Sequence, residues 1–457
     1  MFEGTITNAP HIPRMRAFMD SRSMIRNPVE VFEQYRAELG PTFTFHFGGA
    51  KKAIVSSDPA FVEHVLRVNH ANYHKSEIQV ERMAEFQGQG LLNSHGSEWL
   101  RQRRLLAKGF QHGRLADLLP MQQEILDELI EGFAGEAEEG PVDVYQLMVR
   151  LTLKLVGKSL FGHQIEDAAL EQIGTAISNI QGFIVRQIVQ PYMIPWFRIS
   201  GQSARFQQMR IDADQLIREH IQARVDGGGS DVLGMMLDTP YSDTGELMTD
   251  DQALVESLQL MVAGNETSST ALAWTFYLLA KHPEYIQQIR DEVDQVLGDG
   301  PADMHTLHKL EKTMCIVDEA MRLYPSFWMI DRVALEDDDV HGIRVPAGST
   351  LSLYIYGLHR NTAVWEDPER FDPSRFEKKA RGERPNFSHI PFGGGPRVCI
   401  GSNMAVMQIL LVLVGIIRKY DFSLESQEDI GIRPMMILRP DGAIRMNFKP
   451  VNQAKAE

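Results

Sequence analysis

The stretch that decides the fold lies near the C-terminal end and reads Phe392-Gly393-Gly394-Gly395-Pro396-Arg397-Val398-Cys399-Ile400-Gly401. Three consecutive glycines allow positive φ angles and a close approach of the backbone to a flat ligand. An apolar helix is predicted from Ser402 to Tyr420, so Cys399 lies near a helix N-terminus. The helix dipole and the free N–H groups there favour a thiolate over a thiol. Arg397 adds a positive charge that can bind a carboxylate.

Several kinds of site can be built on one cysteine. Zinc is disfavoured because no second Cys or paired His lies at ligand spacing, and a phosphate loop would need a Lys-Ser/Thr ending. A cysteine nucleophile needs a histidine base, which the sequence does not place, so this alternative stays open. A thiolate among backbone donors, beside an arginine that can take a propionate, favours an axial haem ligand. The other cysteine, Cys315, is typical of a buried small apolar residue.

Composition excludes several classes of protein. The chain has 457 residues, 43% apolar and 23% charged, with two cysteines and a net charge of −15. These values exclude disordered and fibrous classes and a disulfide framework, and they argue against a nucleic-acid-binding surface. We expect no signal peptide, because the first residues have no basic start followed by an apolar stretch. We expect no membrane anchor, because the longest apolar run, 405–417, is too short to span a bilayer. The expected location is cytoplasmic.

Helical periodicity dominates the chain, as in 115–134 and 204–225. Strand patterns occur in two parts, about 42–57 and 333–357, and these suggest one sheet assembled from distant segments. The predicted fold class is mainly α with a minor β-sheet region, in a single domain that covers residues 1–457.

Three further patterns are ambiguous when taken alone. The predicted helix 249–281 begins with a Thr249–Gln252 capping box and contains a polar interruption at 263–270. That interruption fits either a surface patch or a local opening with an acid and an alcohol for proton delivery. Glu319 with Arg322, and Trp99 with Arg103, each share a helical face and could be ordinary surface groups.

The segment 392–401 matches the haem-binding signature of the cytochrome P450 monooxygenases at every fixed position, and the three ambiguous patterns resemble other motifs of that family in the family's order. The resemblance covers essentially the whole chain. It implies the cytochrome P450 fold, with haem b buried between a long central helix and the cysteine loop, and Cys399 as the iron ligand.

The resemblance also implies roles for individual residues. Gly264 would make room for dioxygen, while Glu266 and Thr267 would deliver protons. Glu319 and Arg322 would form a buried ion-pair network with Arg370. The expected contacts to haem are Cys399, Trp99, Arg103, Arg332, Arg397, Phe392, Gly393, Gly395 and Gly401.

The implied reaction inserts one atom of O2 into a C–H bond or a double bond of a small organic substrate. Because no flavin or iron–sulfur segment is present, electrons are expected from a ferredoxin and its reductase, with Arg101 or Arg104 as docking contacts. By analogy, pocket candidates suggest an apolar, adaptable cavity, although Gln87 and its neighbours leave room for a polar substrate. The pocket candidates are Phe183, Phe327, Trp328, Met435, Met436 and Gln87.

Three other functions stay open. The first is oxidative O-demethylation of a more polar methyl ether. The second is a peroxide-dependent or isomerising enzyme on the same fold, although that class tends to lose the acid–alcohol pair that Glu266 and Thr267 form here. The third is a non-catalytic haem or ligand sensor.

Overall fold

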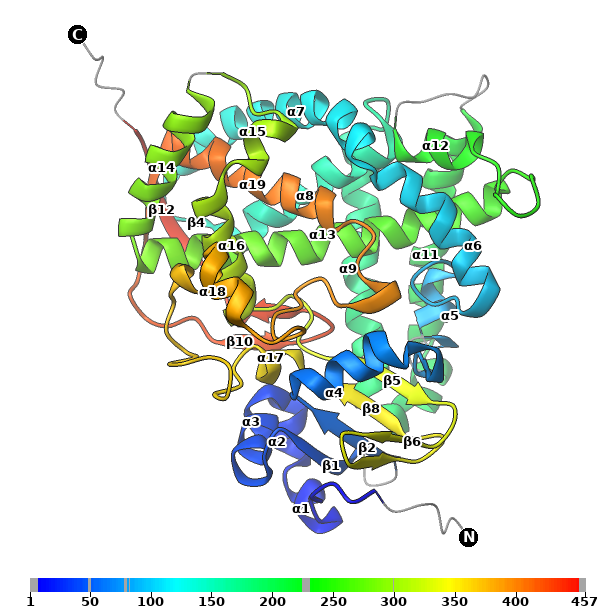
Figure 1. The fold of residues 1–457 in the computed structure, drawn as a ribbon. Helices are drawn as coiled ribbons and strands as arrows, with labels where there is room; N and C mark the ends of the chain where they lie inside the picture. The colour runs from blue at the N-terminus through cyan, green and yellow to red at the C-terminus, as the bar shows by residue number, and fades with distance from the viewer. Residues whose placement is uncertain are drawn as a thin grey trace. The chain divides into compact units, whose positions relative to one another are not determined.

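The computed structural model describes residues 7–47, 51–77, 80–81, 83–223, 231–298 and 300–451. The chain divides into two compact units, and each unit is assembled from distant parts of the sequence. Unit 1 comprises Met1–Glu81, Asp318–Cys399 and Arg433–Arg439, and unit 2 comprises Arg82–Val317, Ile400–Ile432 and Pro440–Glu457. Figure 1 shows the elements of both.

Unit 1 is built on a five-stranded sheet of order β1-β2-β8-β5-β3. The alternating phenylalanines of β1 (Thr42–Phe47) pair antiparallel with β2 (Lys51–Ser56), in a register that sets Phe43 opposite Val55. Strand β2 then runs parallel to β8 (Thr350–Leu353), so the strand patterns near residues 50 and 350 share one sheet, as predicted. The glycines of the expected hairpin turn, Gly48 and Gly49, lie outside the described residues.

The antiparallel pairing of β5 (Ile330–Ala334) with β3 (Tyr73–His74) positions part of the candidate site, because it sets His74 opposite Val333. A separate hairpin is formed by β6 and β7. The remaining elements of unit 1, and those at its borders, are α1 Arg14–Met19, α2 Ser21–Arg26, α3 Pro28–Leu39, α4 Pro59–Glu63, the π-helical turn η1 His64–Val68, η2 His70–Asn72, α16 Glu311–Leu323, β6 Asp338–Val340, β7 Ile343–Val345, α17 Ile355–Leu358, η6 Pro373–Phe376, α18 Lys378–Glu383, η7 Gly395–Arg397, β10 Ile432–Pro434 and β11 Leu438–Pro440.

Unit 2 is helical and centres on α13 (Asp250–Lys281), which packs against α8 (Val144–Phe161) and α19 (Ser402–Lys419). Its other elements are α5 Met83–Gln87, α6 Gly96–Leu106, η4 Ala107–Phe110, α7 His112–Glu139, β4 Val142–Asp143, α9 Asp167–Val189, η5 Pro191–Met193, α10 Ile194–Ile199, α11 Gln202–Gln222, α12 Val232–Asp238, α14 Glu284–Leu297, α15 Met304–His308, β9 Tyr420–Leu424 and β12 Arg445–Pro450.

These elements confirm the predicted class, since helices dominate and the sheets are small. Helix α13 begins after Thr249, whose hydroxyl accepts from the Gln252 backbone N–H at 3.2 Å. The Gln252 side chain, however, bonds Glu256 and the Gln89 carbonyl, so the reciprocal bond of a capping box is not seen.

One described helix, α19, is long and apolar enough by composition to cross a membrane. Within the protein, 61% of that segment is buried, and core helices of soluble proteins meet the same criterion. The position of α19 agrees with the apolar helix that the sequence predicts from Ser402 to Tyr420.

Candidate active site

The cysteine loop of unit 1 folds tightly against η1. A Cβ placed on Gly395 would lie 1.8 Å from the Leu66 carbonyl oxygen, and the Gly395 φ angle is +67°, so no other residue fits there without displacing backbone. The Cys399 N–H donates to the Phe392 carbonyl at 2.9 Å, which closes the loop and leaves Cys399 exposed. Helix α19 begins three residues further along the chain. Gly401, an expected haem contact, precedes α19 with a φ of −91°.

Three cationic side chains of unit 1 interact beside this loop: Lys75, Arg332 and Arg397. Lys75 directly follows β3 and Arg332 lies on β5, so the antiparallel pairing of His74 with Val333 brings them together. Arg332 is only 7% exposed, and one of its N–H groups donates to the Asp331 carbonyl at 2.8 Å. Sequence reasoning predicts Arg332 and Arg397 but misses Lys75, whose position depends on strand pairing over more than 250 residues.

The electrostatics of this cationic group favour an anion. Loss of hydration lowers the pKa of Lys75 to about 7, and the charges of Arg397 and Arg332 add to the effect, whereas Asp331 opposes it. Burial also lowers the pKa of Arg332. A bound carboxylate would stabilise the charged forms of all three side chains.

The unbroken helix α13 carries the predicted acid and alcohol in unit 2. Most of its central residues are buried, but Leu260, Ala263, Gly264 and Thr267 are partly exposed and recur at helical spacing on one face. Glu266 is 7% exposed. The Thr267 hydroxyl donates to the Ala263 carbonyl at 2.7 Å, which is the bond to the preceding turn expected of a threonine here.

Gly264 has a packing role that the sequence interpretation did not include. A Cβ at this position would lie 3.1 Å from both γ-carbons of Val156 on α8, so the missing side chain lets the two helices approach closely. The hydroxyl of Thr152, also on α8, donates to the Asn265 side-chain oxygen at 2.7 Å. The close packing of α8 is thus one reason for a glycine here, and because Gly264 itself is partly exposed, its expected role beside dioxygen stays a prediction.

A row of polar residues on α13 holds the loop that precedes α6. The Glu256 carboxylate accepts from the Leu91 N–H at 3.0 Å, and the Gln259 amide oxygen accepts from the Leu92 N–H at 2.8 Å. Gln259 also donates to the Gly88 carbonyl at 3.0 Å. Burial raises the pKa of Glu256 to about 7, although the bonds from Leu91 and Gln252 oppose the shift. Polar residues at helical spacing in an apolar helix were a sequence signal for this contact.

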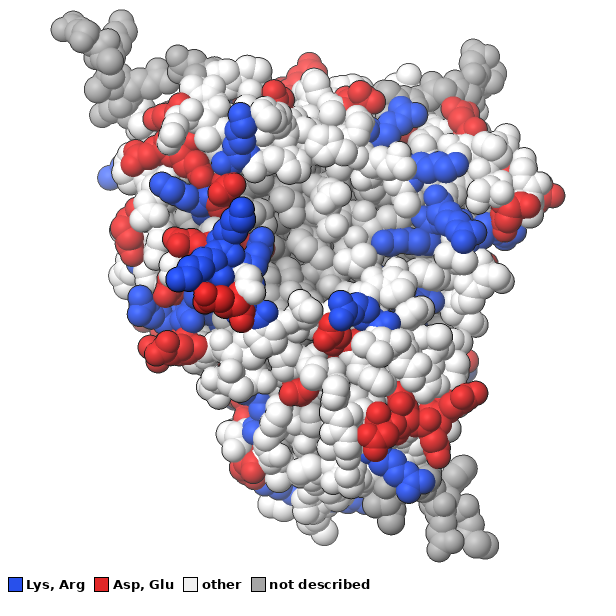
Figure 2. Space-filling view, in the orientation of Figure 1, with Lys and Arg blue, Asp and Glu red and all other residues white. Residues whose placement is uncertain are grey.

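Trp99 and Arg103 lie on α6, both partly buried, and Trp99 packs against the hydrophobic core of unit 2. Arg104 is exposed, whereas Arg101 lies over the Tyr241 ring at 4.8 Å from its centroid. Figure 2 shows basic side chains gathered over this helix. Of the two expected docking contacts, Arg104 is thus the one fully available to a partner.

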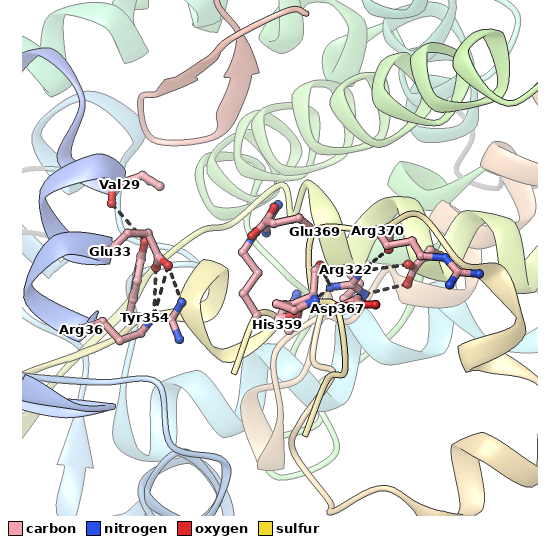
Figure 3. Close-up of polar contacts among 12 residues, drawn as sticks. Val29, Glu33, Arg36, Arg322, Tyr354, His359, Asp367, Glu369 and Arg370 are labelled. Carbon is pink, nitrogen blue, oxygen red and sulfur yellow. Dashed lines mark hydrogen bonds and ion pairs between the residues drawn. The ribbon is translucent and has the colours of Figure 1, made fainter. Parts of the chain in front are cut away.

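The predicted ion pair between Glu319 and Arg322 is fully buried and bidentate, with N–O distances of 2.7 and 2.8 Å. Arg322 also donates to the carbonyls of His359, Pro368 and Arg370, so it fastens several loop segments of unit 1 (Figure 3). The Glu319 carboxylate in turn accepts from the Asp372 N–H at 2.8 Å.

The role assigned to the Arg370 side chain was wrong. Its guanidinium is 68% exposed and faces Asp372, and only its backbone carbonyl joins the network. The arginine that approaches Glu319 is Arg375, at 3.5 Å and 14% exposed. Arg370 and Arg375 lie five residues apart in the chain. The path of the loop determines which of the two side chains points toward Glu319.

The residues predicted to line a substrate pocket differ in how far they are buried and in what they contact. Phe183 is buried in unit 2, stacked on Phe206 at 4.3 Å between ring centroids. Trp328 donates its indole N–H to the Met435 carbonyl at 2.8 Å and packs against a core cluster of unit 1, so its polar atom is already satisfied. Among the others in unit 1, Phe327 is 43% exposed, whereas Met435 and Met436 are partly buried, like Trp328.

Gln87 differs from a solvated glutamine. It ends α5, is only 2% exposed, and neither its amide nitrogen nor its amide oxygen has a hydrogen-bond partner among the described residues. Phe86 beside it packs edge-on against Phe183, with ring centroids 5.7 Å apart. A buried amide without partners costs about 1–3 kcal/mol per polar group, so a ligand group is expected to satisfy it.

The residues of unit 1 fit the haem that the resemblance implies. The loop presents an exposed thiol, its glycines allow a close approach, and the adjoining cations match two carboxylates. No cluster of three or more His, Cys, Asp or Glu side chains that could hold a metal ion occurs among the described residues.

Comparisons with known proteins agree with this geometry. A sequence model of the family described as "Cytochrome P450" matches residues 10–448. The chain is 31% identical over 463 residues to "Cytochrome P450 734A5" of Oryza sativa subsp. japonica, covering 95% of this chain and 84% of that one. It is 27% identical over 452 residues to "Putative cytochrome P450 132" of Mycobacterium tuberculosis (strain ATCC 25618 / H37Rv), covering 95% and 96%.

A further relative, "Cyclooctatin synthase" of Streptomyces melanosporofaciens, is 29% identical over 405 residues, covering 88% of this chain and 87% of that one. Among solved structures, the crystal structure of the cytochrome P450DA heme domain has a TM-score of 0.84 at 23% identity, covering 97% of this chain and 98% of that one. This structural likeness supports the fold.

Proposed function

The chain belongs to the cytochrome P450 family, so it is a haem-thiolate monooxygenase that carries haem b, and we propose that its substrate is a largely apolar small molecule with one hydrogen-bonding group. The observation that carries this proposal is the buried amide of Gln87, which has neither donor nor acceptor satisfied among the described residues. The phenylalanines packed on Phe183, of which Phe86 is next to Gln87 in the chain, are proposed as the apolar surroundings of this amide.

Cys399 is proposed as the iron ligand, with Lys75, Arg332 and Arg397 holding the propionates. Phe392, Gly393 and Gly395 shape the loop around the thiolate, and Trp99 and Arg103 on α6 are proposed as further propionate contacts. Haem bound through a thiolate supplies the activation of dioxygen. The chain's own residues bind and orient the cofactor, and they manage protons and water.

We propose that Glu266 and Thr267 deliver protons during turnover. The Thr267 hydroxyl donates to the Ala263 carbonyl, and a hydroxyl oxygen that donates one hydrogen bond has lone pairs that can accept others. Thr267 lies on the partly exposed face of α13, where small molecules can reach it, and Glu266 is the acid one position away. This pair favours a reductant-dependent monooxygenase over a peroxide-dependent enzyme or a sensor.

The reaction proposed is hydroxylation or epoxidation. Oxidative O-demethylation is the second candidate, because Gln87 is buried and not solvated, and a methyl ether with a neighbouring hydroxyl would satisfy the same amide. The family match spans both compact units, which supports one catalytic domain over residues 1–457.

Electron delivery requires redox partners, as in the family. We propose a ferredoxin and its reductase in the cytoplasm, with Arg104 on α6 as a docking contact. The acidic surface of a ferredoxin would be attracted to a local basic group even though the whole chain is acidic. An Arg104→Glu variant should raise the KM for ferredoxin, whereas Arg205→Glu on α11, with the same charge change, should not.

The substrate proposal is tested by spectral titration of the ferric protein. Pairs of ligands that share one carbon skeleton would be compared, for example a terpenoid hydrocarbon and its alcohol or methyl ether. We expect the functionalised member to bind at least about tenfold more tightly, and Gln87→Leu to abolish that preference. Equal preference in both proteins would contradict the role of Gln87. Formaldehyde release from methyl ethers distinguishes demethylation from hydroxylation.

A further inference from the structure

The helices α1 and α2 expose their apolar side chains. On α1, Met15, Phe18 and Met19 recur at helical spacing on one face and are 70%, 73% and 73% exposed. Ile25 on α2 is 50% exposed. Neither helix contains a buried residue, and the side chains that pack against the core of unit 1 are the partly buried Ala17 and Met24. The apolar face of α1 therefore points to solvent instead of to the core of unit 1.

The same segment is basic in an acidic protein. Between residues 13 and 27, four arginines and one aspartate give a net charge of +3, whereas the whole chain carries −15. Arg22 and Arg26 are exposed, and neither has an ion-pair partner among the described residues. The single acid, Asp20, accepts a hydrogen bond from the Tyr35 hydroxyl at 2.7 Å.

The exposed face is held in place by the body of unit 1. The Ile12 N–H donates to the Thr44 carbonyl at 2.8 Å, Arg14 donates to the His46 ring at 3.2 Å, and Arg16 forms a bidentate pair with Glu38. Figure 1 shows α1 and α2 beside α3 and β1. The apolar side chains are thus displayed on a fixed support.

We propose that Met15, Phe18, Met19, Arg22, Ile25 and Arg26, here called the N-terminal surface, bind the surface of a bilayer that contains anionic phospholipids. Large apolar side chains interleaved with arginines are typical of segments that lie at the boundary between headgroups and acyl chains. The arginines match lipid phosphates, and the local positive charge is attracted to an anionic leaflet that repels the rest of the protein. Binding is peripheral and needs no spanning helix.

A second copy of the chain fits this surface less well. A symmetric dimer would place two such surfaces, each with a net charge of +2 from Arg22 and Arg26, against one another. Lipid binding also suits an enzyme with a largely apolar substrate, because such molecules concentrate in bilayers.

Vesicle flotation with the purified holoprotein tests the proposal. Vesicles of phosphatidylcholine with one quarter phosphatidylglycerol would be compared with pure phosphatidylcholine, at low and high salt. We expect flotation with the anionic vesicles only, and at least a fivefold loss of bound protein at high salt because exposed charges are then screened. The Phe18→Asp/Met19→Asp variant should lose at least tenfold in partitioning.

Two controls distinguish binding through this surface from nonspecific electrostatic or hydrophobic binding elsewhere on the protein. Leu247→Asp removes another exposed apolar side chain, 56% exposed, and should float like the parent protein. Arg22→Glu/Arg26→Glu should lose binding, whereas Arg205→Glu/Lys449→Glu, with the same charge change, should retain most of it. The ferric spectrum of each variant reports that the fold is kept.

The proposal is overturned if the parent protein does not float with anionic vesicles, or if Phe18→Asp/Met19→Asp floats equally well. It is also overturned if sedimentation without lipid shows a dimer that this variant abolishes while vesicles bind nothing, because the surface would then join two copies of the chain. Neither result would affect the substrate proposal, which rests on a different unit.

Discussion

The hydroxyl of Thr267 donates a 2.7 Å hydrogen bond to the carbonyl of Ala263, one turn earlier on α13. Two turns further along, Thr275 makes the same bond to Ala271 at the same distance. The two threonines differ in environment, because Thr275 is fully buried whereas Thr267 lies on the partly exposed face of the helix. Substitutions at the two positions can therefore be compared: both lose the same hydrogen bond within the helix, but only Thr267 is placed to deliver protons.

Replacing Thr267 with Ala should uncouple the enzyme. Reductant should still be consumed, but product per reductant should fall by about tenfold or more, since positioned proton transfer contributes factors of this size or larger. The measurement is the ratio of product and hydrogen peroxide to NAD(P)H consumed. Thr275→Ala, which loses the matched bond, should keep normal coupling; if both variants uncouple equally, Thr267 has no special role.

Lys75→Met should have opposite effects with and without haem. The folded pKa of about 7 lies below the ordinary 10.5, so the folded apoprotein binds fewer protons between these values. The presence of Lys75 therefore destabilises the apoprotein most below about pH 7, and the penalty declines as pH rises toward 10.5. We expect the variant apoprotein to resist urea better at pH 6.5.

In the holoprotein the same change would remove a cation that we propose holds a propionate. Haem loss to an excess of apomyoglobin should accelerate on the order of tenfold, as expected for a charge-assisted hydrogen bond. Unchanged haem loss, together with an unchanged apoprotein, would show that Lys75 does not face the cofactor.

Glu319→Gln should strongly destabilise the protein, because it leaves the fully buried guanidinium of Arg322 without a carboxylate. Loss of one partner from such a pair costs about 3–5 kcal/mol. Arg370→Ala keeps the backbone carbonyl that joins the network and removes only an exposed side chain, so it should change stability by less than about 0.5 kcal/mol. Urea unfolding and the yield of haem-bound protein measure both, and a large effect of Arg370→Ala would restore the role that the sequence suggested.

Stability should fall as pH rises from about 4.5 to 7 through the contribution of Glu256. Burial raises its folded pKa to about 7, so the folded state binds the proton more tightly than the unfolded state, and this advantage is lost as the carboxyl ionises. Glu256→Gln should remove this part of the pH dependence. The free energy of unfolding of the variant, relative to that of the parent protein, should therefore be higher at pH 8 than at pH 5. Urea midpoints across this range test it, with the exposed Glu246→Gln as control; a difference independent of pH would contradict the assignment.

The sequence was sufficient where a motif is contiguous or follows one helical face. The loop 392–401 is explained by local geometry, since the backbone of η1 excludes a side chain at Gly395. The burial of Glu319 and Arg322 followed from resemblance, and the structure provides the hydrogen bonds that make it tolerable.

The sequence was insufficient where a role depends on contacts between distant segments. Lys75 meets Arg332 only through the pairing of β3 with β5, and Arg375 rather than Arg370 turns toward Glu319 because of the loop path. The packing of Gly264 against Val156 of α8 was likewise not evident from the sequence. Gln87 could have been a solvated side chain, and only its burial makes it a specificity candidate.

The central claim is that Cys399 binds haem as a thiolate, and the absorption spectrum of the purified protein tests it most directly. The ferric spectrum and the spectrum of the reduced carbon monoxide complex should be of the thiolate type in the parent protein and in Cys315→Ser, because Cys315 is the matched second cysteine. Cys399→Ser should lose the thiolate spectrum and product formation together. A thiolate-type spectrum that persists in Cys399→Ser, or a parent protein that binds no haem, would contradict the account.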